Sequence, residues 1–218
     1  LKAHYPAEYM AALMTRRFSQ ITEITKLMEE CQSMNIKTLG PDVNESYRAF
    51  GVNEHGEIRF GLSAIKGMGT PAADAIVAER EKNGPYKDIF DFAQRVDFSN
   101  VNRKAFESLA LSGGFDSFGI PRENFFGVNN KNEMFLDTLV RYGQLYQREQ
   151  HEAVTSLFGG LDAIEIATPP IPHAEGWSTI ERLNKERDLV GIYLSAHPLD
   201  DYSVVLNSMC NTHCAELG

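Results

Sequence analysis

The sequence has 218 residues, 43% of them hydrophobic and 23% charged, which is typical of a globular protein with one large or two small domains. No apolar segment approaches the roughly 20 residues that a membrane-spanning helix needs, and no signal peptide is recognisable. We therefore expect a cytoplasmic protein with no membrane partner. Because the chain begins at Leu1 rather than at a methionine, we also expect it to be part of a longer protein.

Three cysteines are too few for a disulfide scaffold, and they fit a reducing compartment. Cys210, His213 and Cys214 have the chemistry of zinc ligands, but the sequence offers no fourth ligand nearby. We therefore predict no metal site in this chain.

The net charge of −9 by itself argues against a nucleic-acid partner, but it is unevenly distributed. Residues 55–105 hold eight Lys or Arg and seven Asp or Glu, whereas the other residues hold thirteen and twenty-three. The middle of the chain is therefore the part that would repel a phosphate backbone least.

The pattern of apolar residues predicts a mainly α, multi-helical fold with one small β-hairpin. A helix is expected to begin at 5–8, and others to span 19–35, 63–66, 70–82, 88–96, 102–111 and 121–152, the last with possible breaks at 127 and 129–130. Thr70 is the expected N-cap of the 70–82 helix. A short strand is expected at 36–39, and strands at 50–52 and 58–60 flank a hairpin turn. A final helix should begin near Trp177 and end at His197-Pro198.

Residues 65–69 form a turn of the hydrophobic-x-Gly-hydrophobic-Gly type. Gly67 and Gly69 allow a tight turn and the close approach of another backbone, and Met68 should point into the core. Downstream, Ala73 lets two helices pack closely and Ile76 fills the space between them. These positions together predict a helix-hairpin-helix element.

This hairpin has the chemistry of a phosphate-binding site. The amides near Gly69 and Thr70 begin a helix, where four N–H groups lack intrahelical acceptors and attract anions. Lys66 can add a cationic contact. Because phosphates carry no sequence information, the expected DNA contact at Lys66, Gly67, Met68, Gly69 and Thr70 is independent of base sequence.

A second, poorer copy of the hairpin is predicted at 111–115, which would make the unit a tandem one. It follows a helix that carries Arg103 and Lys104, which we include among the predicted DNA-binding residues. Phe115 replaces the second glycine of the pattern, so this copy could serve packing only. The helix at 88–96 would connect the two copies.

An ordered set of further motifs extends over nearly the whole chain. Its segments are 2–12, 41–44, 58–67, 101–103, 114–116 and 191–200. In these segments the chain resembles the alpha subunit of bacterial DNA polymerase III, a C-family replicative DNA polymerase. The resemblance implies that 1–50 are the C-terminal part of the fingers region and 51–152 the helix-hairpin-helix unit with its following long helix. It further implies a linker at 153–176 and, at 177–218, a helical segment that leads toward an oligonucleotide-binding barrel beyond this sequence.

The family polymerises DNA on a primer–template duplex with two metal ions held by aspartates. This chain has no Asp-x-Asp sequence. The resemblance implies that those aspartates precede Leu1, so we predict no catalytic residues, no cofactor and no activity for this chain alone. The longer polymerase would use Mg²⁺ and associate with other replicase subunits.

The family also binds the sliding clamp through a short peptide similar to Gln-x-x-Leu-Phe. The corresponding residues here are Val154, Thr155, Ser156, Leu157 and Phe158. Leu157 and Phe158 would be the apolar anchors, whereas Val154 stands in place of the polar glutamine, which predicts weak binding.

Two other functions remain open from the sequence. The hairpin could belong to a DNA repair or recombination protein, since the same motif is used in several functions. Alternatively, it could be a helix joint in a purely structural or interaction domain. A catalytic domain is disfavoured, because the sequence has no nucleophile–base set and no phosphate loop of the Walker type.

Overall fold

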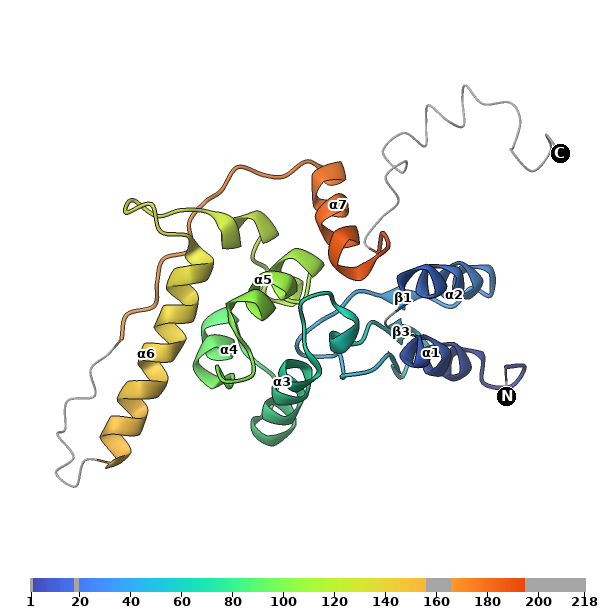
Figure 1. The fold of residues 1–218 in the computed structure, drawn as a ribbon, viewed down its shortest axis with the longest axis horizontal. Coiled ribbons are helices and arrows are strands. Elements are labelled where there is room, and N and C mark those ends of the chain that lie inside the picture. Colours follow the sequence, from blue (N-terminus) through green and yellow to red (C-terminus); the bar gives the residue numbers. More distant parts are fainter. Residues whose placement is uncertain (1, 18–19, 156–165, 195–218) are drawn as a thin grey trace.

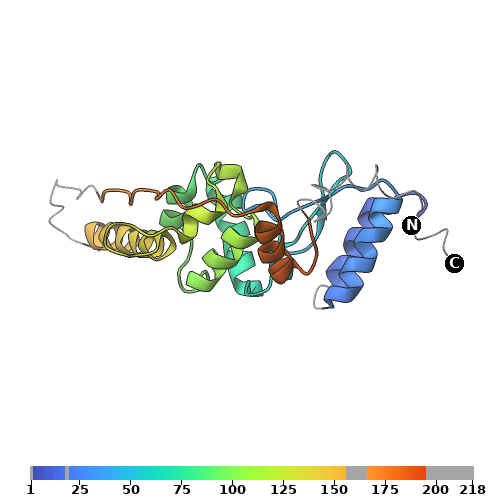
Figure 2. The same ribbon diagram turned by 90° about the horizontal axis from the view of Figure 1, so that it is seen from above.

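The structure, a computed structural model, describes residues 2–17, 20–155 and 166–194. Its elements form an elongated array (Figure 1). Helices α1 (Pro6–Arg16) and α2 (Ile21–Ser33) lie at one end, and α6 (Phe135–Thr155) at the other. Figure 2 shows the same order from above, with the central helices between these two ends.

A small sheet connects α1 and α2 to the centre of the molecule. Its strands are β1 (Thr38–Leu39), β2 (Gly51–Val52) and β3 (Ile58–Arg59), in the order β1-β3-β2. Strands β2 and β3 are antiparallel, with Val52 opposite Ile58, so the predicted hairpin is confirmed. The strand predicted at 36–39 is β1, which pairs in parallel with β3 of the hairpin. The amide of Ile58 donates to the carbonyl of Lys37 at 2.9 Å in this pairing.

The first hairpin, residues 65–69, joins the 3-10 turn η1 (Leu62–Ala64) to helix α3 (Thr70–Asn83). The helix predicted at 63–66 is thus a single 3-10 turn that ends earlier. The N-cap of α3 is Gly69, with extended φ and ψ of −75° and 155°, and Thr70 is already helical. Thr70 is therefore not the N-cap, and its hydroxyl does not cap the helix.

Helices α4 (Ile89–Arg95) and α5 (Arg103–Ser112) follow the prediction closely because polar side chains cap their first turns. The carboxylate of Asp88 accepts the amides of Phe90 and Asp91, both at 2.8 Å. Asn102 accepts the amide of Ala105 at 3.1 Å. Such side chains satisfy amides that have no intrahelical acceptor and so fix where each helix begins.

A chain of buried aromatic rings forms the centre of the core. Phe92 lies in edge-on contact with Phe106 and Phe115, with centroids 5.3 and 5.0 Å apart, and Phe115 continues to Phe125 at 5.5 Å. These side chains are at most 1% exposed. Because they come from different elements, their burial ties α4 and α5 to the segment that follows.

The long helix predicted at 121–152 is interrupted at the places given as possible breaks, 127 and 129–130. The 3-10 turn η2 (Asp116–Phe118) precedes this segment, which consists of the 3-10 turn η3 (Arg122–Phe126) and then α6. Between η3 and α6, the side chain of Asn129 accepts the amides of Lys131 and Glu133, and Asn132 has a φ of +59°. These local bonds form a tight turn in place of a continuous helix.

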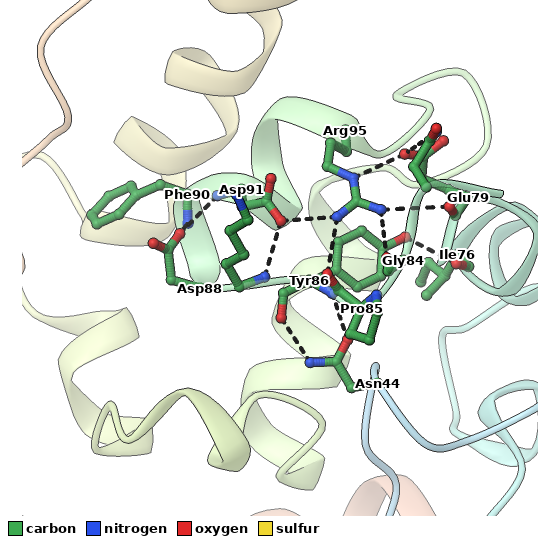
Figure 3. Close-up of polar contacts among 12 residues, drawn as sticks. Asn44, Ile76, Glu79, Gly84, Pro85, Tyr86, Asp88, Phe90, Asp91 and Arg95 are labelled. Carbon is green, nitrogen blue, oxygen red and sulfur yellow. Dashed lines mark hydrogen bonds and ion pairs between the residues drawn. The ribbon is translucent and has the colours of Figure 1, made fainter. Parts of the chain in front are cut away.

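A polar cluster fixes the junction of α3 and α4 (Figure 3). Gly84 ends α3 with a φ of +85°, and the guanidinium of Arg95 donates to the carbonyl of Gly84 at 2.7 Å and to the carboxylates of Glu79 and Asp91. The Tyr86 hydroxyl donates to the carbonyl of Ile76 at 2.9 Å, and burial raises its pKa far above the usual range.

Helix α7 (Thr179–Val190) packs on α5. Ser178 caps its N-terminus by accepting the amide of Glu181 at 3.2 Å. It ends at Gly191, which has a left-handed φ of +85°, and not at His197-Pro198 as predicted, because a left-handed glycine terminates a helix by itself. Among the described helices, none combines the length and apolar character that crossing a bilayer requires.

Candidate nucleic-acid interface

The first hairpin is anchored in the core by its apolar residues. Ile65 is 1% exposed and Met68 is 5% exposed, so Met68 points inward as predicted. Ala73 and Ile76 of α3 are fully buried. The turn is therefore anchored by its buried apolar side chains, while Lys66, Gly67 and Gly69 lie at the surface.

The two glycines of the turn lie in different surroundings. Gly67 has a φ of +90°, and a Cβ there would lie 2.6 Å from the hydroxyl of Ser108 in α5. That hydroxyl donates to the carbonyl of Lys66 at 3.0 Å. Gly67 is thus required by close packing within the protein.

Gly69 has open space around it. A Cβ there would meet only the Pro71 ring, at 3.5 Å. No described residue accepts a hydrogen bond from the amides of Gly69, Thr70 or Ala72. Since Pro71 has no amide, these three N–H groups are the donors that the start of α3 presents. They form a compact set of donors at the positive end of a helix, where an anion binds favourably.

Two lysines lie next to this turn. Lys66 and Lys104 are exposed, and neither forms an ion pair with any described residue. Although Lys104 belongs to α5, its Cε lies 3.2 Å from the position that a Cβ on Gly67 would occupy. The first hairpin and α5 therefore bring two unpaired cations to one turn.

Arg103 is engaged elsewhere. Its Nε donates to Asp137 at 2.6 Å and its Nη1 to Glu107 at 2.6 Å. The hydrogen bond to Asp137 is the largest cause of a raised pKa at the Arg103 guanidinium. Two carboxylates therefore already neutralise this cation, and its predicted DNA contact stays a prediction with less support than that of Lys104.

The second hairpin, residues 111–115, is turned inward. Gly113 has a φ of +90°, like Gly67, but Gly113, Gly114 and Phe115 are all buried. The carbonyl of Gly114 accepts the amide of Val43 at 3.0 Å. The guanidinium of Arg122 fills the space beside Gly113, where a Cβ would lie 2.3 Å from its Nη2. This copy holds an internal cation and packs in the core.

Other predicted site residues lie at the limit of the described chain or beyond it. Val154 and Thr155 are the last residues of α6, whereas Ser156, Leu157 and Phe158 lie outside the described residues, as do Cys210, His213 and Cys214. Within residues 2–17, 20–155 and 166–194, no three His, Cys, Asp or Glu side chains gather closely enough to hold a metal ion.

Sequence reasoning missed Ser108 and Arg122, which connect the hairpins to other elements. Ser108 carries no signal, because a serine within a helix is usually a solvated residue. Arg122 is 7% exposed, although an arginine after a glycine-rich loop would be expected at the surface. Ser108 bonds to Lys66 and Arg122 bonds to Glu186, and each of these contacts joins residues that are distant in the sequence.

Comparison with known proteins gives the same motif and a family. The model of the helix-hairpin-helix motif matches residues 35–125. The DNA polymerase III subunit alpha of Pasteurella multocida is 38% identical over 206 residues, which cover 93% of this chain and 17% of the relative. That of Haemophilus influenzae is 37% identical over 224 residues, covering 100% and 18%. That of Chlamydia trachomatis is 39% identical, covering 92% and 16%. The chain therefore spans less than a fifth of the length of these relatives, and the comparisons support its being a fragment of a DNA polymerase III alpha subunit.

Proposed function

We propose that the chain holds the backbone of primer–template DNA, without reading base sequence, within a replicative DNA polymerase. The observation that carries this proposal is the set of three amides at the start of α3, at Gly69, Thr70 and Ala72, flanked by Lys66 and Lys104. A phosphate oxygen accepts hydrogen bonds from such amides, and the two ammonium groups add attraction at short range.

The charge distribution supports a localised contact. The chain carries a net charge of −9, so its overall field repels DNA at long range. Affinity must therefore come from the free amides at the start of α3 and from the two lysines. The attraction of the lysines acts within about a Debye length of 8–10 Å. This favours a supporting contact in a larger complex over tight binding by this chain alone.

Polymerisation itself is proposed for the longer protein, as the names of the relatives suggest. The described residues do not fit a two-metal site, because they contain no cluster of metal-holding side chains. We propose that this chain alone does not extend a primer. A primer-extension assay with the chain and Mg²⁺ tests this, and extension above background would contradict it.

The DNA contact can be tested by fluorescence anisotropy with two duplexes of unrelated sequence at several salt concentrations. We expect equal affinity for both duplexes. For duplex DNA, each phosphate contact contributes about 0.9 to the slope of log K against log[salt]. Lys66→Gln and Lys104→Gln should each lower this slope by about that amount.

Lys82→Gln is the matched control, since it removes an exposed lysine from the last turn of α3, at the opposite end of that helix from the free amides. It should change the slope little. Unchanged slopes for both lysine variants would refute the hairpin contact and favour a purely structural role of this helix joint. A clear preference for one duplex would point to base recognition instead.

We also propose that 154–158 bind the sliding clamp. The support is the Leu157-Phe158 pair in the sequence and the position of α6, whose C-terminal end leads away from the hairpins (Figure 1). Surface plasmon resonance with the clamp should show weaker binding of Leu157→Ala/Phe158→Ala, and an unchanged dissociation constant would contradict this role. Contacts with other replicase subunits are part of the same proposal for the longer protein.

A further inference from the structure

A buried ion pair connects α7 to Arg122 of η3, whose guanidinium fills the space beside Gly113 of the second hairpin. Nη1 of Arg122 lies 2.8 Å from Oε2 of Glu186, and the two side chains are 7% and 1% exposed. The same guanidinium donates to Asp116 at 2.6 Å and to the carbonyl of Leu111, the first residue of the second hairpin, at 3.3 Å. Removing one member of such a pair leaves the other charge buried, so the pair resists separation.

One helical turn further along, α7 contacts the first hairpin. The carbonyl of Leu189 accepts the amide of Lys66 at 2.9 Å. On its other side the Lys66 peptide is held by the hydroxyl of Ser108, which donates to its carbonyl. The backbone of Lys66 is therefore fixed on both sides, by α7 and by α5, directly before the glycine that begins the turn.

We propose that Arg122 and Glu186 are positioning residues for DNA binding: the second hairpin anchors α7, and α7 holds the first hairpin in its binding conformation. This inference rests on the proposed function of the first hairpin. It also explains the inward second copy, because the space beside Gly113 that could face a phosphate is taken by Arg122. In this proposal the first hairpin binds phosphate, and the second hairpin helps to hold α7 in place.

The physical consequence is a change in population. Without the Leu189 bond, the Lys66 peptide has one fixed side, and the hairpin occupies its binding conformation for a smaller fraction of the time. Apparent affinity falls in proportion to that fraction. The number of phosphates contacted in the complex does not change, so the salt slope stays the same. An unchanged salt slope therefore distinguishes loss of a positioning residue from loss of Lys66 or Lys104, which lowers the slope.

The test is Glu186→Gln in the full chain, with Glu181→Gln as matched control. Glu181 lies on the same helix and loses the same charge, but its side chain is 50% exposed. Hydrogen exchange measured by NMR should be faster by about tenfold or more at the Lys66 amide of Glu186→Gln, and unchanged at the Phe92 amide in α4. Duplex binding should weaken several-fold with an unchanged salt slope. Glu181→Gln should behave as the wild type.

Unchanged exchange at Lys66 in Glu186→Gln would overturn the inference. So would faster exchange with unchanged DNA affinity, provided that Lys104→Gln still weakens binding. If neither lysine variant affects binding, the proposed function fails first, and the inference fails with it. Should Glu186→Gln not fold, Arg122→Met/Glu186→Leu replaces the pair by apolar side chains that keep α7 docked. This double variant should retain both the Lys66 protection and the DNA affinity, and loss of either in a folded protein would contradict the anchor role.

Discussion

The guanidinium of Arg95 lies over the ring of Tyr86, with Cζ 4.6 Å from the ring centroid. The same group donates to the carbonyls of Gly84 and Pro85, at 2.7 and 3.2 Å, where α3 has just ended (Figure 3). The carbonyls at the end of a helix lack intrahelical donors, and here one arginine supplies them. The N-terminus of α3 forms the candidate phosphate site. Arg95 of α4 therefore helps to fix the orientation of that site by its contacts at the opposite end of α3.

Arg95→Met should lower the free energy of unfolding by about 2–3 kcal/mol, because it leaves partly buried carbonyls and two carboxylates without their donor. Arg95→Lys should recover little of this, since a single ammonium cannot reproduce a planar fork of donors. Urea unfolding measures both. Lys82→Gln, an exposed charge on the last turn of α3, is the control. Equal stability of Arg95→Lys and the wild type would show that charge alone suffices.

Gly67→Ala should destabilise the protein by about 2–3 kcal/mol, because alanine is strained at a φ of +90° and its Cβ would collide with the Ser108 hydroxyl. Gly69→Ala should cost less than about 1 kcal/mol, since its φ of −75° is ordinary. Thermal unfolding of the two variants compares them directly. A reversed order of stability would show that the tight packing of α5 against the turn is not maintained in solution.

Gly69→Asp should change stability and DNA binding in opposite directions. Gly69 is the N-cap of α3, and an aspartate there can accept the free amide of Ala72 and favour the positive end of the helix. Stability should rise by up to about 1 kcal/mol. Duplex affinity should fall by about tenfold or more, because the carboxylate occupies the amides that a phosphate would use and repels it. Paired unfolding and anisotropy measurements test this, and undiminished affinity in the stabilised variant would contradict a phosphate site at these amides.

Cys31 should react with iodoacetamide only when the protein unfolds. Its thiol is fully buried, and burial raises its pKa from 9.0 to about 11. The stability that the neutral thiol contributes is therefore fully present below pH 9 and is lost as the pH rises through about 11. Mass spectrometry of a Cys210→Ser/Cys214→Ser variant at pH 8 follows Cys31 alone. Rapid labelling without denaturant would mean that α2 detaches from the sheet in solution.

Local sequence signals predicted much of the first hairpin and of helices α4 and α5. Asp88 and Asn102 marked the starts of α4 and α5, and the inward position of Met68 followed from the spacing of apolar residues around the turn. These features are set by residues within a few positions of one another. A break near Asn129 was also expected, but the bonds that form it were not: the Asn129 side chain accepts the amides of Lys131 and Glu133 and so competes with the helix that the apolar pattern favours.

The composition of the candidate site was less predictable. The pairing of Arg103 with Asp137 joins α5 to α6, and nothing near Arg103 in the sequence indicates it. Lys104 is the next residue along the chain, yet it lies beside the first hairpin. Which of two adjacent cations is free depends on the packing of helices, and so does the bond from Lys66 to Leu189.

The bond between Lys66 and Leu189 has a consequence for the order of synthesis. A chain leaves the ribosome from its N-terminal side, so both hairpins emerge before α7 does. A nascent chain that has reached residue 155 already contains Ser108 and every residue of the first turn, but it lacks the helix that supplies the Leu189 carbonyl. The turn therefore acquires its last constraint only after the following linker has been translated. Competence to hold a phosphate backbone should accordingly appear late, and ribosome-bound chains halted before residue 190 should protect the Lys66 amide less than chains long enough for α7 to have left the ribosome.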